Sequence, residues 1–228
     1  AVFFMYIASG LPLALVGSTL QAWYTVSGLD LTTIGILTLV GQPYAYKFIW
    51  APLFDRYIPL NIGRRRSWIF IMQLCLAVSL AVMSFLKPDE TPWLLAAVAL
   101  AVACFSASQD IVIDAYRTDL LSNEERGMGA AIVTLGYRLA LLLSGAIALI
   151  LGKEIGWHNT YLIMAGVMVV EMGITLWSPN PVDEPRPPAT LMHAVVEPMR
   201  EFLARPNAVA LLVFIIIYKI CDAFALSL

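Results

Sequence analysis

The chain has 228 residues, of which 60% are hydrophobic and only 13% are charged, and its formal net charge is −2 at pH 7. A soluble globular domain is roughly half apolar and about one quarter charged, so this composition with its long apolar runs predicts an all-α polytopic membrane protein. There is no basic face beyond one short loop, so nucleic-acid binding has no support.

Seven hydrophobic segments are each about long enough to cross a bilayer, whose ~30 Å of hydrocarbon requires about 20 helical residues. They cover residues 1–24, 32–54, 67–86, 93–113, 128–151, 160–178 and 208–228. The chain begins at Ala1 with no basic segment before its first apolar run, and it stops at Leu228 inside another. We therefore expect a fragment of a longer membrane protein.

The sixth linker differs from the others because it opens with the sequence SPNPVDEPRPP, which is too rich in proline for helix or sheet. Apolar residues at helical spacing in 189–207 then predict an amphipathic helix on the membrane surface, which Pro198 should kink or divide. A solvated tether is the alternative. We expect a six-helix lobe at 1–178, a cytoplasmic inter-lobe linker at 179–207 and the start of a second lobe at 208–228.

The distribution of Lys and Arg orients the segments. Linkers two, four and six contain nine of these residues: Arg56, Arg64, Arg65, Arg66, Arg117, Arg126, Arg186, Arg200 and Arg205. Linkers one, three and five contain only Lys87 and Lys153. Because cytoplasmic loops carry the excess of positive charge, the even linkers and the N-terminus are expected on the cytoplasmic side.

Six segments, a long linker and the start of a seventh have the organisation of half a transporter. The second segment contains LVGQPY at 39–44 and the fifth contains TLGYR at 134–138, so each has a glycine followed by polar residues. These two segments occupy equivalent positions in a pair of inverted three-helix repeats, which is a common transporter architecture. A membrane receptor or scaffold built from the same segments is the alternative from another class.

Six charged residues lie well inside the apolar segments: Lys47, Arg138, Lys219, Asp110, Glu171 and Asp222. Each costs ~2.5–3.5 kcal/mol at bilayer depth on insertion scales, so each is expected to be paired or to line a wet cavity. Lys219 and Asp222 are three residues apart, and we expect an intrahelical pair there.

Lys47 and Arg138 are the two cations that we expect to bind an anionic group of a substrate. Arginine is the stronger candidate for a carboxylate because its guanidinium can bind both oxygens. The alternative is a structural salt bridge from either cation to Asp110 or Glu171. Neighbouring polar and aromatic residues, and one glutamine toward the expected entry side, complete the candidate substrate site: Tyr137, Tyr44, Gln42 and Gln21.

Asp110, Asp114 and Arg117 share one helical face because they are spaced at i, i+4 and i+7. Two carboxylates one turn apart repel each other, which favours proton binding at one of them. Arg117 can hold Asp114 ionised, which leaves Asp110, deeper and less compensated, as the candidate proton carrier. Glu171 competes for that role, and Asp110 neutralising Lys47 or Arg138 is the alternative. The cysteines and histidines show neither metal-ligand spacing nor a nucleophile–base pair, so we expect no metal, no cofactor and no enzyme activity.

The sequence APLFDR at 51–56, followed by GRR at 63–65, resembles the loop signature of the major facilitator superfamily, G-x-L-x-D-R-x-G-R-R. Ala51 replaces the usual first glycine, and the segment between Arg56 and Gly63 is longer than usual. The resemblance implies that Asp55 bonds to a helix end or to an arginine and holds the lobes together. We assign gating roles to these residues: Asp55, Arg56, Gly63, Arg64, Arg65 and Arg117.

Several further blocks, in the same order along the chain, are similar to the muropeptide permease (AmpG) family: ASGLPLALVGSTLQAW, APLFDRY, GRRRSW, SASQDIVIDAYRTDLL, ERGMGAA, LGYRLA and YKICDAFA. The resemblance implies a permease of the bacterial inner membrane that imports N-acetylglucosamine–anhydro-N-acetylmuramyl peptides for cell-wall recycling. It also implies coupling to the proton gradient and a C-terminal lobe beyond this chain. The acetyl-CoA transporter family shares the general pattern and is the alternative within the superfamily.

Overall fold

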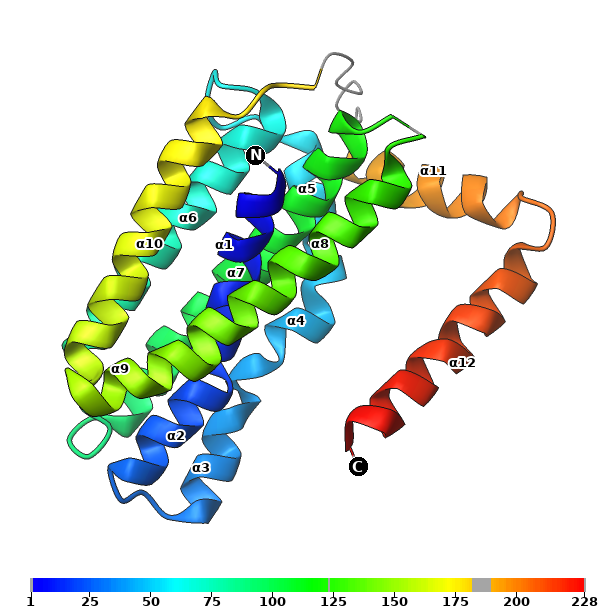
Figure 1. The fold of residues 1–228 in the computed structure, drawn as a ribbon. Helices are drawn as coiled ribbons and strands as arrows, with labels where there is room; N and C mark the ends of the chain where they lie inside the picture. The colour runs from blue at the N-terminus through cyan, green and yellow to red at the C-terminus, as the bar shows by residue number, and fades with distance from the viewer. Residues whose placement is uncertain (1, 123, 182–189, 228) are drawn as a thin grey trace. The chain divides into compact units, whose positions relative to one another are not determined.

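The computed structural model describes residues 2–122, 124–181 and 190–227 (Figure 1). Every secondary-structure element in this described part is helical. The chain divides into two compact units, Ala1–Arg186 and Pro187–Leu228. The boundaries expected from the sequence, at residues 178 and 207, stay predictions.

The first unit opens with α1 (Val2–Val16) and α2 (Ser18–Val26), which together form one apolar span of 25 residues. Pro12 lies inside α1, and the two helices are separated at Gly17. This span is the most buried of the membrane-length helices in the described residues, because 67% of its most apolar window lies inside the protein.

The second hydrophobic segment is not one continuous helix, as the apolar run at 32–54 had predicted. It consists of five short pieces: α3 (Leu31–Leu37), η1 (Thr38–Gly41), α4 (Pro43–Tyr46), η2 (Lys47–Ile49) and α5 (Ala51–Arg56). Pro43 has no N–H to donate, so the regular helical ladder is interrupted there. The N–H groups of Gln42 and Ala45 instead bond three residues back, to the carbonyls of Leu39 and Gln42, at 3.0 and 2.9 Å.

The other helices of the first unit are longer: α6 (Arg64–Ser84), α7 (Pro92–Leu120), α8 (Arg126–Leu141), the π-helical η3 (Leu142–Ile147), α9 (Ala148–Glu154) and α10 (Trp157–Trp177). In the described residues, five helices are long and apolar enough to cross a membrane, counting α8 to α9 as one. They correspond to the first, third, fourth, fifth and sixth predicted segments.

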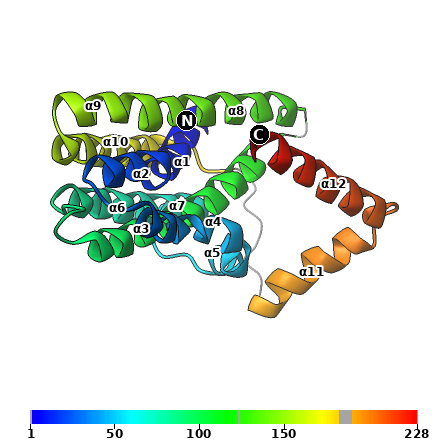
Figure 2. The ribbon, with the colours of Figure 1, turned by 90° about the horizontal axis from the view of Figure 1, so that it is seen from below.

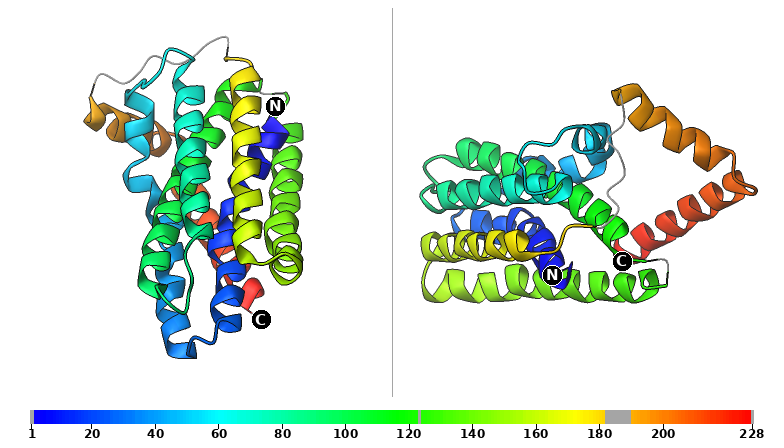
Figure 3. Two further views of the ribbon diagram at one scale, coloured as in Figure 1. Left: turned by 90° about the vertical axis from the view of Figure 1, so that its left-hand side faces the viewer. Right: turned by 90° about the horizontal axis from the view of Figure 1, so that it is seen from above.

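The helices of the first unit pack in three rows, seen from below in Figure 2 and from above in the right panel of Figure 3. One row contains α8 and α9, the middle row α1, α2 and α10, and the third row α3, α6 and α7. The central helix α1 therefore contacts α7, α8 and α10. It approaches α8 closely at two glycines. A Cβ atom on Gly10 would lie 2.8 Å from Cβ of Ala140, and one on Gly136 would lie 3.0 Å from the carbonyl oxygen of Phe3.

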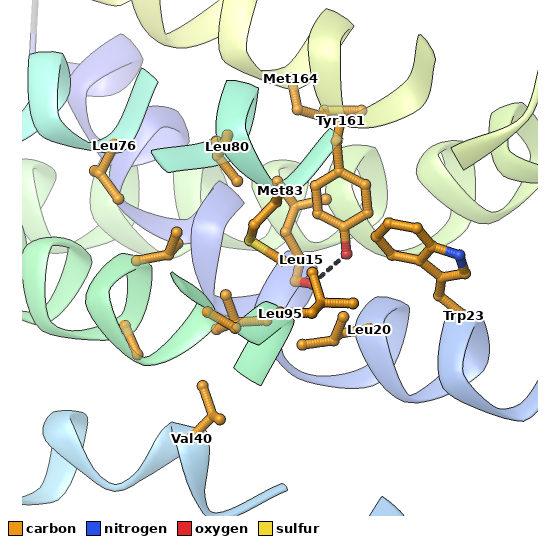
Figure 4. Packing of buried hydrophobic residues seen from close by; sticks show 14 of the residues in the cluster. Leu15, Leu20, Trp23, Val40, Leu76, Leu80, Met83, Leu95, Tyr161 and Met164 are labelled. Atoms are coloured by element: carbon orange, nitrogen blue, oxygen red, sulfur yellow. Dashed lines mark hydrogen bonds between the residues drawn. The ribbon is translucent and has the colours of Figure 1, made fainter. Parts of the chain in front are cut away.

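A hydrophobic core fills the end of the first unit at which α2 meets α10 (Figure 4). The hydroxyl of Tyr161 donates a hydrogen bond to the carbonyl of Leu15 at 2.9 Å, and the tyrosine is fully buried. The ring of Trp23 stacks on that of Trp157, with centroids 5.6 Å apart and planes at 17°. This packing joins the first span to the sixth and fixes the middle row of helices.

The second unit contains α11 (Leu191–Leu203) and α12 (Ala208–Ser227), which are bent by 102° where they meet. Pro198 lies inside α11 and does not divide the helix, so the prediction that it would divide it is wrong. Side-chain contacts between residues one helical turn apart lie on both sides of the proline. Nδ1 of His193 lies 2.9 Å from the carboxylate of Glu197, and Arg205 forms an ion pair with Glu201 at 2.8 Å. The placement of α11 on a membrane surface stays a prediction.

Candidate substrate and proton site

The basic loop, residues 55–66, covers the end of α5, its connection to α6 and the first turn of α6, and it is bonded to the ends of two other helices. Arg65 forms ion pairs with Asp55 at 2.6 Å and with Asp119, near the end of α7, at 2.9 Å. Arg66 donates to the carbonyl of Thr175 in α10 at 3.1 Å. The loop, the end of α7 and the end of α10 therefore lie at one end of the first unit, at the top of Figure 1. Asp55 bonds to an arginine, which was one of the two partners expected for it.

Gly63 immediately precedes α6 and has a backbone conformation that favours glycine, with φ at +100°. A Cβ atom at this position would also meet the side-chain oxygen of Asn180. Arg64, which follows, donates to the backbone carbonyl of Asp55 at 3.1 Å. The backbone geometry thus favours glycine at this position, and the side chain of Asn180 would also have to move for any other residue. In contrast, Arg56 lies over the ring of the adjacent Tyr57, at 5.5 Å from its centroid.

An ion pair joins the second hydrophobic segment to α7 in the interior of the unit. The ammonium of Lys47 lies 3.2 Å from Oδ2 of Asp110, and the two side chains are 32% and 11% exposed. Ser9 of α1 donates a short hydrogen bond to the other carboxylate oxygen of Asp110. Three elements that are far apart in the sequence therefore meet at one carboxylate, and the alternative of a pair between Lys47 and Asp110 is what the structure shows.

Asp114 lies one turn farther along the same face of α7. Its carboxylate accepts a hydrogen bond of 2.5 Å from the hydroxyl of Tyr6, and Nη2 of Arg117 lies 3.9 Å away. The guanidinium of Arg117 also lies 5.9 Å from the centroid of the Tyr6 ring. The expectation that Asp110 is the less compensated acid is wrong, because Lys47 comes to it from a distant part of the chain.

Arg138, in contrast, is an exposed cation, and within the described residues its side chain forms no ion pair and no hydrogen bond. Its neighbour Tyr137 packs on α1, because Cδ2 of the ring lies 3.2 Å from the position that a Cβ of Gly10 would take. Gly10 follows Ser9, the donor to Asp110. The contact between α1 and α8 thus brings Arg138 to the same region of the lobe as the Lys47–Asp110 pair.

The structure distributes the remaining candidates unevenly. Tyr44 is half-buried and packs against the hydrophobic core, in the same short-helix region as Lys47. Gln42 and Gln21 are exposed, and no bond in the described part of the chain joins them to the ion pair. Lys219 and Asp222 belong to α12, but their side chains fall outside the described part of the structure, so the pair between them stays a prediction.

Glu171 lies in a separate polar cluster between α6 and α10. Its side chain is buried, with 4% of the residue exposed, and its Oε2 has no hydrogen-bond partner in the described part. One turn away, Thr175 donates to the side-chain oxygen of Gln73 at 2.9 Å, and both residues are fully buried. The structure therefore separates the two candidate proton carriers, Asp110 on α7 beside α1 and Glu171 on α10 beside α6.

Four participants were not anticipated from the sequence: Ser9, Tyr6, Asp119 and Trp50. The indole of Trp50 donates to the hydroxyl of Ser108 at 3.0 Å and so makes a second polar contact between the second segment and α7. Tyr6 and Ser9 are spaced at i and i+3 on α1, which places both on the face toward α7. That spacing was the available signal, but it has no meaning until α7 is known to be the neighbour.

The chain belongs to the major facilitator superfamily, because the sequence-family model described as Major Facilitator Superfamily matches residues 2–227. It is 52% identical over 222 residues to the anhydromuropeptide permease of Escherichia coli strain K12, a match that covers 97% of this chain and 45% of the relative. An uncharacterized protein of Haemophilus influenzae is 38% identical over 96% of this chain and 53% of its own length. The putative transporter AmpG 4 of Rickettsia felis is 30% identical over 97% and 56%.

The chain spans about half the length of the curated relatives it matches. The family and the apolar helices together establish a multi-pass membrane protein of all-α fold, as predicted. The relatives named by activity are a permease and transporters, which agrees with the expectation that the chain is not an enzyme.

Proposed function

We propose that this chain is the N-terminal lobe of a permease that carries anhydromuropeptides across the bacterial inner membrane by alternating access, for cell-wall recycling. The name of the E. coli relative, at 52% identity, supports the substrate class. The observation that carries the proposal is the charge arrangement: a paired Lys47 and Asp110 beside an exposed Arg138 that has no partner in the described part. A structural charge set would be fully paired, whereas a binding site keeps one cation free for an anionic ligand.

In this proposal, Arg138 binds a carboxylate of the peptide part of the substrate through two parallel N–H hydrogen bonds of its guanidinium. Lys47 binds a second anionic group once it is released from Asp110, and Tyr137 and Tyr44 contact the sugar rings. Buried ion pairs have large desolvation costs, so breaking one requires that the partner lose its charge or find another ion. Proton binding at Asp110 satisfies the first condition, and the incoming substrate satisfies the second.

Coupling to the proton gradient follows from the same pair. When Asp110 takes up a proton, Lys47 loses its partner and becomes available to the substrate, and when the substrate leaves, Lys47 again favours the ionised carboxylate. Ser9 supports either form, because a hydroxyl can donate to a carboxylate or accept from a protonated acid. Glu171 is the second candidate, and its burial between α6 and α10 favours a role within the lobe rather than at the substrate.

The end of the lobe that contains the basic loops is proposed to face the cytoplasm, with the N-terminus on that side. The excess of Arg in the even linkers supports this orientation. The contacts of Arg65 with Asp55 and Asp119 are proposed to hold this end in one state of the transport cycle.

The test uses the whole protein in membrane vesicles with an imposed proton gradient and labelled anhydromuropeptide. Uptake that depends on the gradient is expected. Uptake that is absent, in vesicles shown to contain the folded protein, would refute the substrate assignment. Gradient-driven uptake of labelled acetyl-CoA in its place would support the alternative within the superfamily.

A further inference from the structure

A small cavity, separate from the Lys47–Asp110 pair, lies where α7 ends and α8 begins. It has a volume of about 190 Å³, and the described residues that line it are Arg117, Thr118, Leu121 and Arg126. Two of these four residues are cations and none is an acid. The cavity is thus a small basic pocket. It lies where α7 ends and α8 begins, which is the end of the lobe that carries the basic loop.

The acids near this pocket are committed to other partners. Asp114 accepts a hydrogen bond from Tyr6 at 2.5 Å, while its distance to Arg117 is 3.9 Å. Asp119 is bonded to Arg65 at 2.9 Å. The positive charge of the pocket is therefore only weakly compensated from the side of α7.

The linker contributes no closer acid. The carboxylate of Glu125 accepts from the N–H and the hydroxyl of Ser122, at 3.1 and 2.9 Å, and these bonds lower the pKa of Glu125 below its usual range. Glu124 is exposed, and the described contacts join it to neither arginine. Nε of Arg117 is buried without a hydrogen-bond partner in the part of the chain that the structure describes. The Arg117 side chain as a whole is 27% exposed, so its other N–H groups can meet an acceptor oxygen in the pocket.

The position of the pocket relates it to the substrate site. Arg117 lies seven residues after Asp110 on the same face of α7, or about 10 Å along the helix at ~1.5 Å per residue. Arg117 is also held against Tyr6 of α1, which is the helix that provides Ser9 to Asp110. An anion that moves from the ion pair toward the basic end of the lobe would meet this pocket next.

We propose that the Arg117–Arg126 pocket is an exit subsite that binds a carboxylate of the departing substrate. The inference rests on the proposed function. The size of the pocket fits a carboxylate with its water rather than a whole glycopeptide, since a water molecule occupies about 30 Å³ in the liquid. A guanidinium binds a carboxylate through two parallel hydrogen bonds, and the two arginines supply both charge and direction.

The experiment measures apparent KM from each side of the membrane. The whole protein is reconstituted in phosphatidylcholine liposomes in two separate preparations, each with one orientation of the protein. Labelled anhydromuropeptide is added outside, so that each preparation presents one face to the substrate. In Arg126→Gln, the KM at the face with the basic linkers should rise about fivefold, which is the effect of losing one partly solvated charged contact. The KM at the opposite face should be unchanged. Arg126→Lys should recover part of the affinity. The matched control is Arg205→Gln, which removes an exposed arginine that follows the end of α11.

A second substrate identifies the group that is bound. When the peptide carboxylates of the muropeptide are amidated, the difference between wild type and Arg126→Gln should disappear. A difference that persists with the amidated compound, or an equal change at both faces, would overturn the exit subsite. A difference that appears only when anionic lipid is added to the liposomes would assign the pocket to a lipid phosphate and would also overturn it. Wild-type protein that transports from neither face would remove the proposed function itself.

Discussion

The carboxylate of Asp110 and the ammonium of Lys47 lie 3.2 Å apart, although 63 residues separate them in the sequence. The pair connects a regular helix, α7, to a segment composed of short helical pieces. Each charge lies at a depth at which an isolated ion is unfavourable, so each partner is the main reason that the other is tolerated. The stability of the lobe and its proposed transport chemistry therefore depend on the same two side chains.

Removing one member of this pair should destabilise the protein more than removing both. Lys47→Met leaves the buried carboxylate of Asp110 without its cation, and we expect a loss of about 2 kcal/mol, below the usual cost because Lys47 is partly exposed. The double variant Lys47→Met/Asp110→Asn should recover most of that loss. Thermal unfolding of the purified protein checks both. Additive losses in the double variant would show that the two side chains are not energetically coupled.

Arg138→Ala should reduce the kcat/KM of muropeptide uptake at least tenfold, since the lost contact is a charged hydrogen bond of ~1.5–3 kcal/mol. The amount of protein in the membrane should be unchanged, because the described residues give Arg138 no partner that its removal would leave unpaired. Lys153→Ala, which removes an exposed cation of the same span, is the control. Uptake that survives in Arg138→Ala would remove this residue from the substrate site.

Asp110→Asn should separate transport from its energy source. The variant cannot release a proton at this position, so accumulation against a gradient should be lost. Exchange of labelled for unlabelled muropeptide, which needs no net proton movement, should continue. Glu171→Gln is the informative comparison, because Glu171 is buried in the other polar cluster. Loss of accumulation in Glu171→Gln alone would transfer the proton role to α10.

Asp55→Asn should impair the conformational switch more than substrate binding. The substitution weakens the 2.6 Å ion pair with Arg65 and leaves that arginine bonded only to Asp119. Cysteine labelling on both sides of the membrane measures the switch, and equilibrium binding of muropeptide measures the site. An equal reduction of the two would contradict a gating role.

Gly136→Ala tests the close approach of α1 and α8. The added methyl would lie 3.0 Å from the carbonyl oxygen of Phe3 and 3.1 Å from Cβ of Tyr6, so both helices must move apart. Overpacking of this kind costs about 1–3 kcal/mol, which should appear as a lower unfolding temperature. Gly166→Ala is the control, because a Cβ there meets nothing within 4 Å and alanine favours the helix. Equal unfolding temperatures for the two variants would refute the tight contact.

The sequence was sufficient for the features that depend on local pattern. Apolar runs predicted the long helices, and the spacing of Asp110, Asp114 and Arg117 predicted that they share a face of α7. The loop signature predicted that Asp55 finds a partner, which is Arg65. The first two rest on residues that are close in one helix, where helical geometry determines what is adjacent. The third rests on the resemblance to the superfamily's loop signature.

The pairing across helices could not be predicted in the same way. Ser9 reaches Asp110 across 101 residues and Arg65 reaches Asp119 across 54, and neither pair has a signal in a single sequence. The second segment was apolar enough to be taken for a continuous helix, but Pro43 and the turns around it divide the run. Hydropathy reports the environment of such a segment and says nothing of its backbone hydrogen bonds.

The broken second segment has a mechanical consequence for the lobe. The helices around α1 are long rods packed through glycines and a buried aromatic core, and such an assembly resists small deformations. Lys47 instead begins a three-residue 3-10 helix between two short α-helices, and a 3-10 stretch of this kind often marks a hinge. The first unit thus combines long, closely packed helices around α1 with one segment, from α3 to α5, that is made of short helices. In the proposed mechanism Lys47 exchanges a carboxylate for a ligand, and its position on this segment would let its reach change while the long helices keep their arrangement.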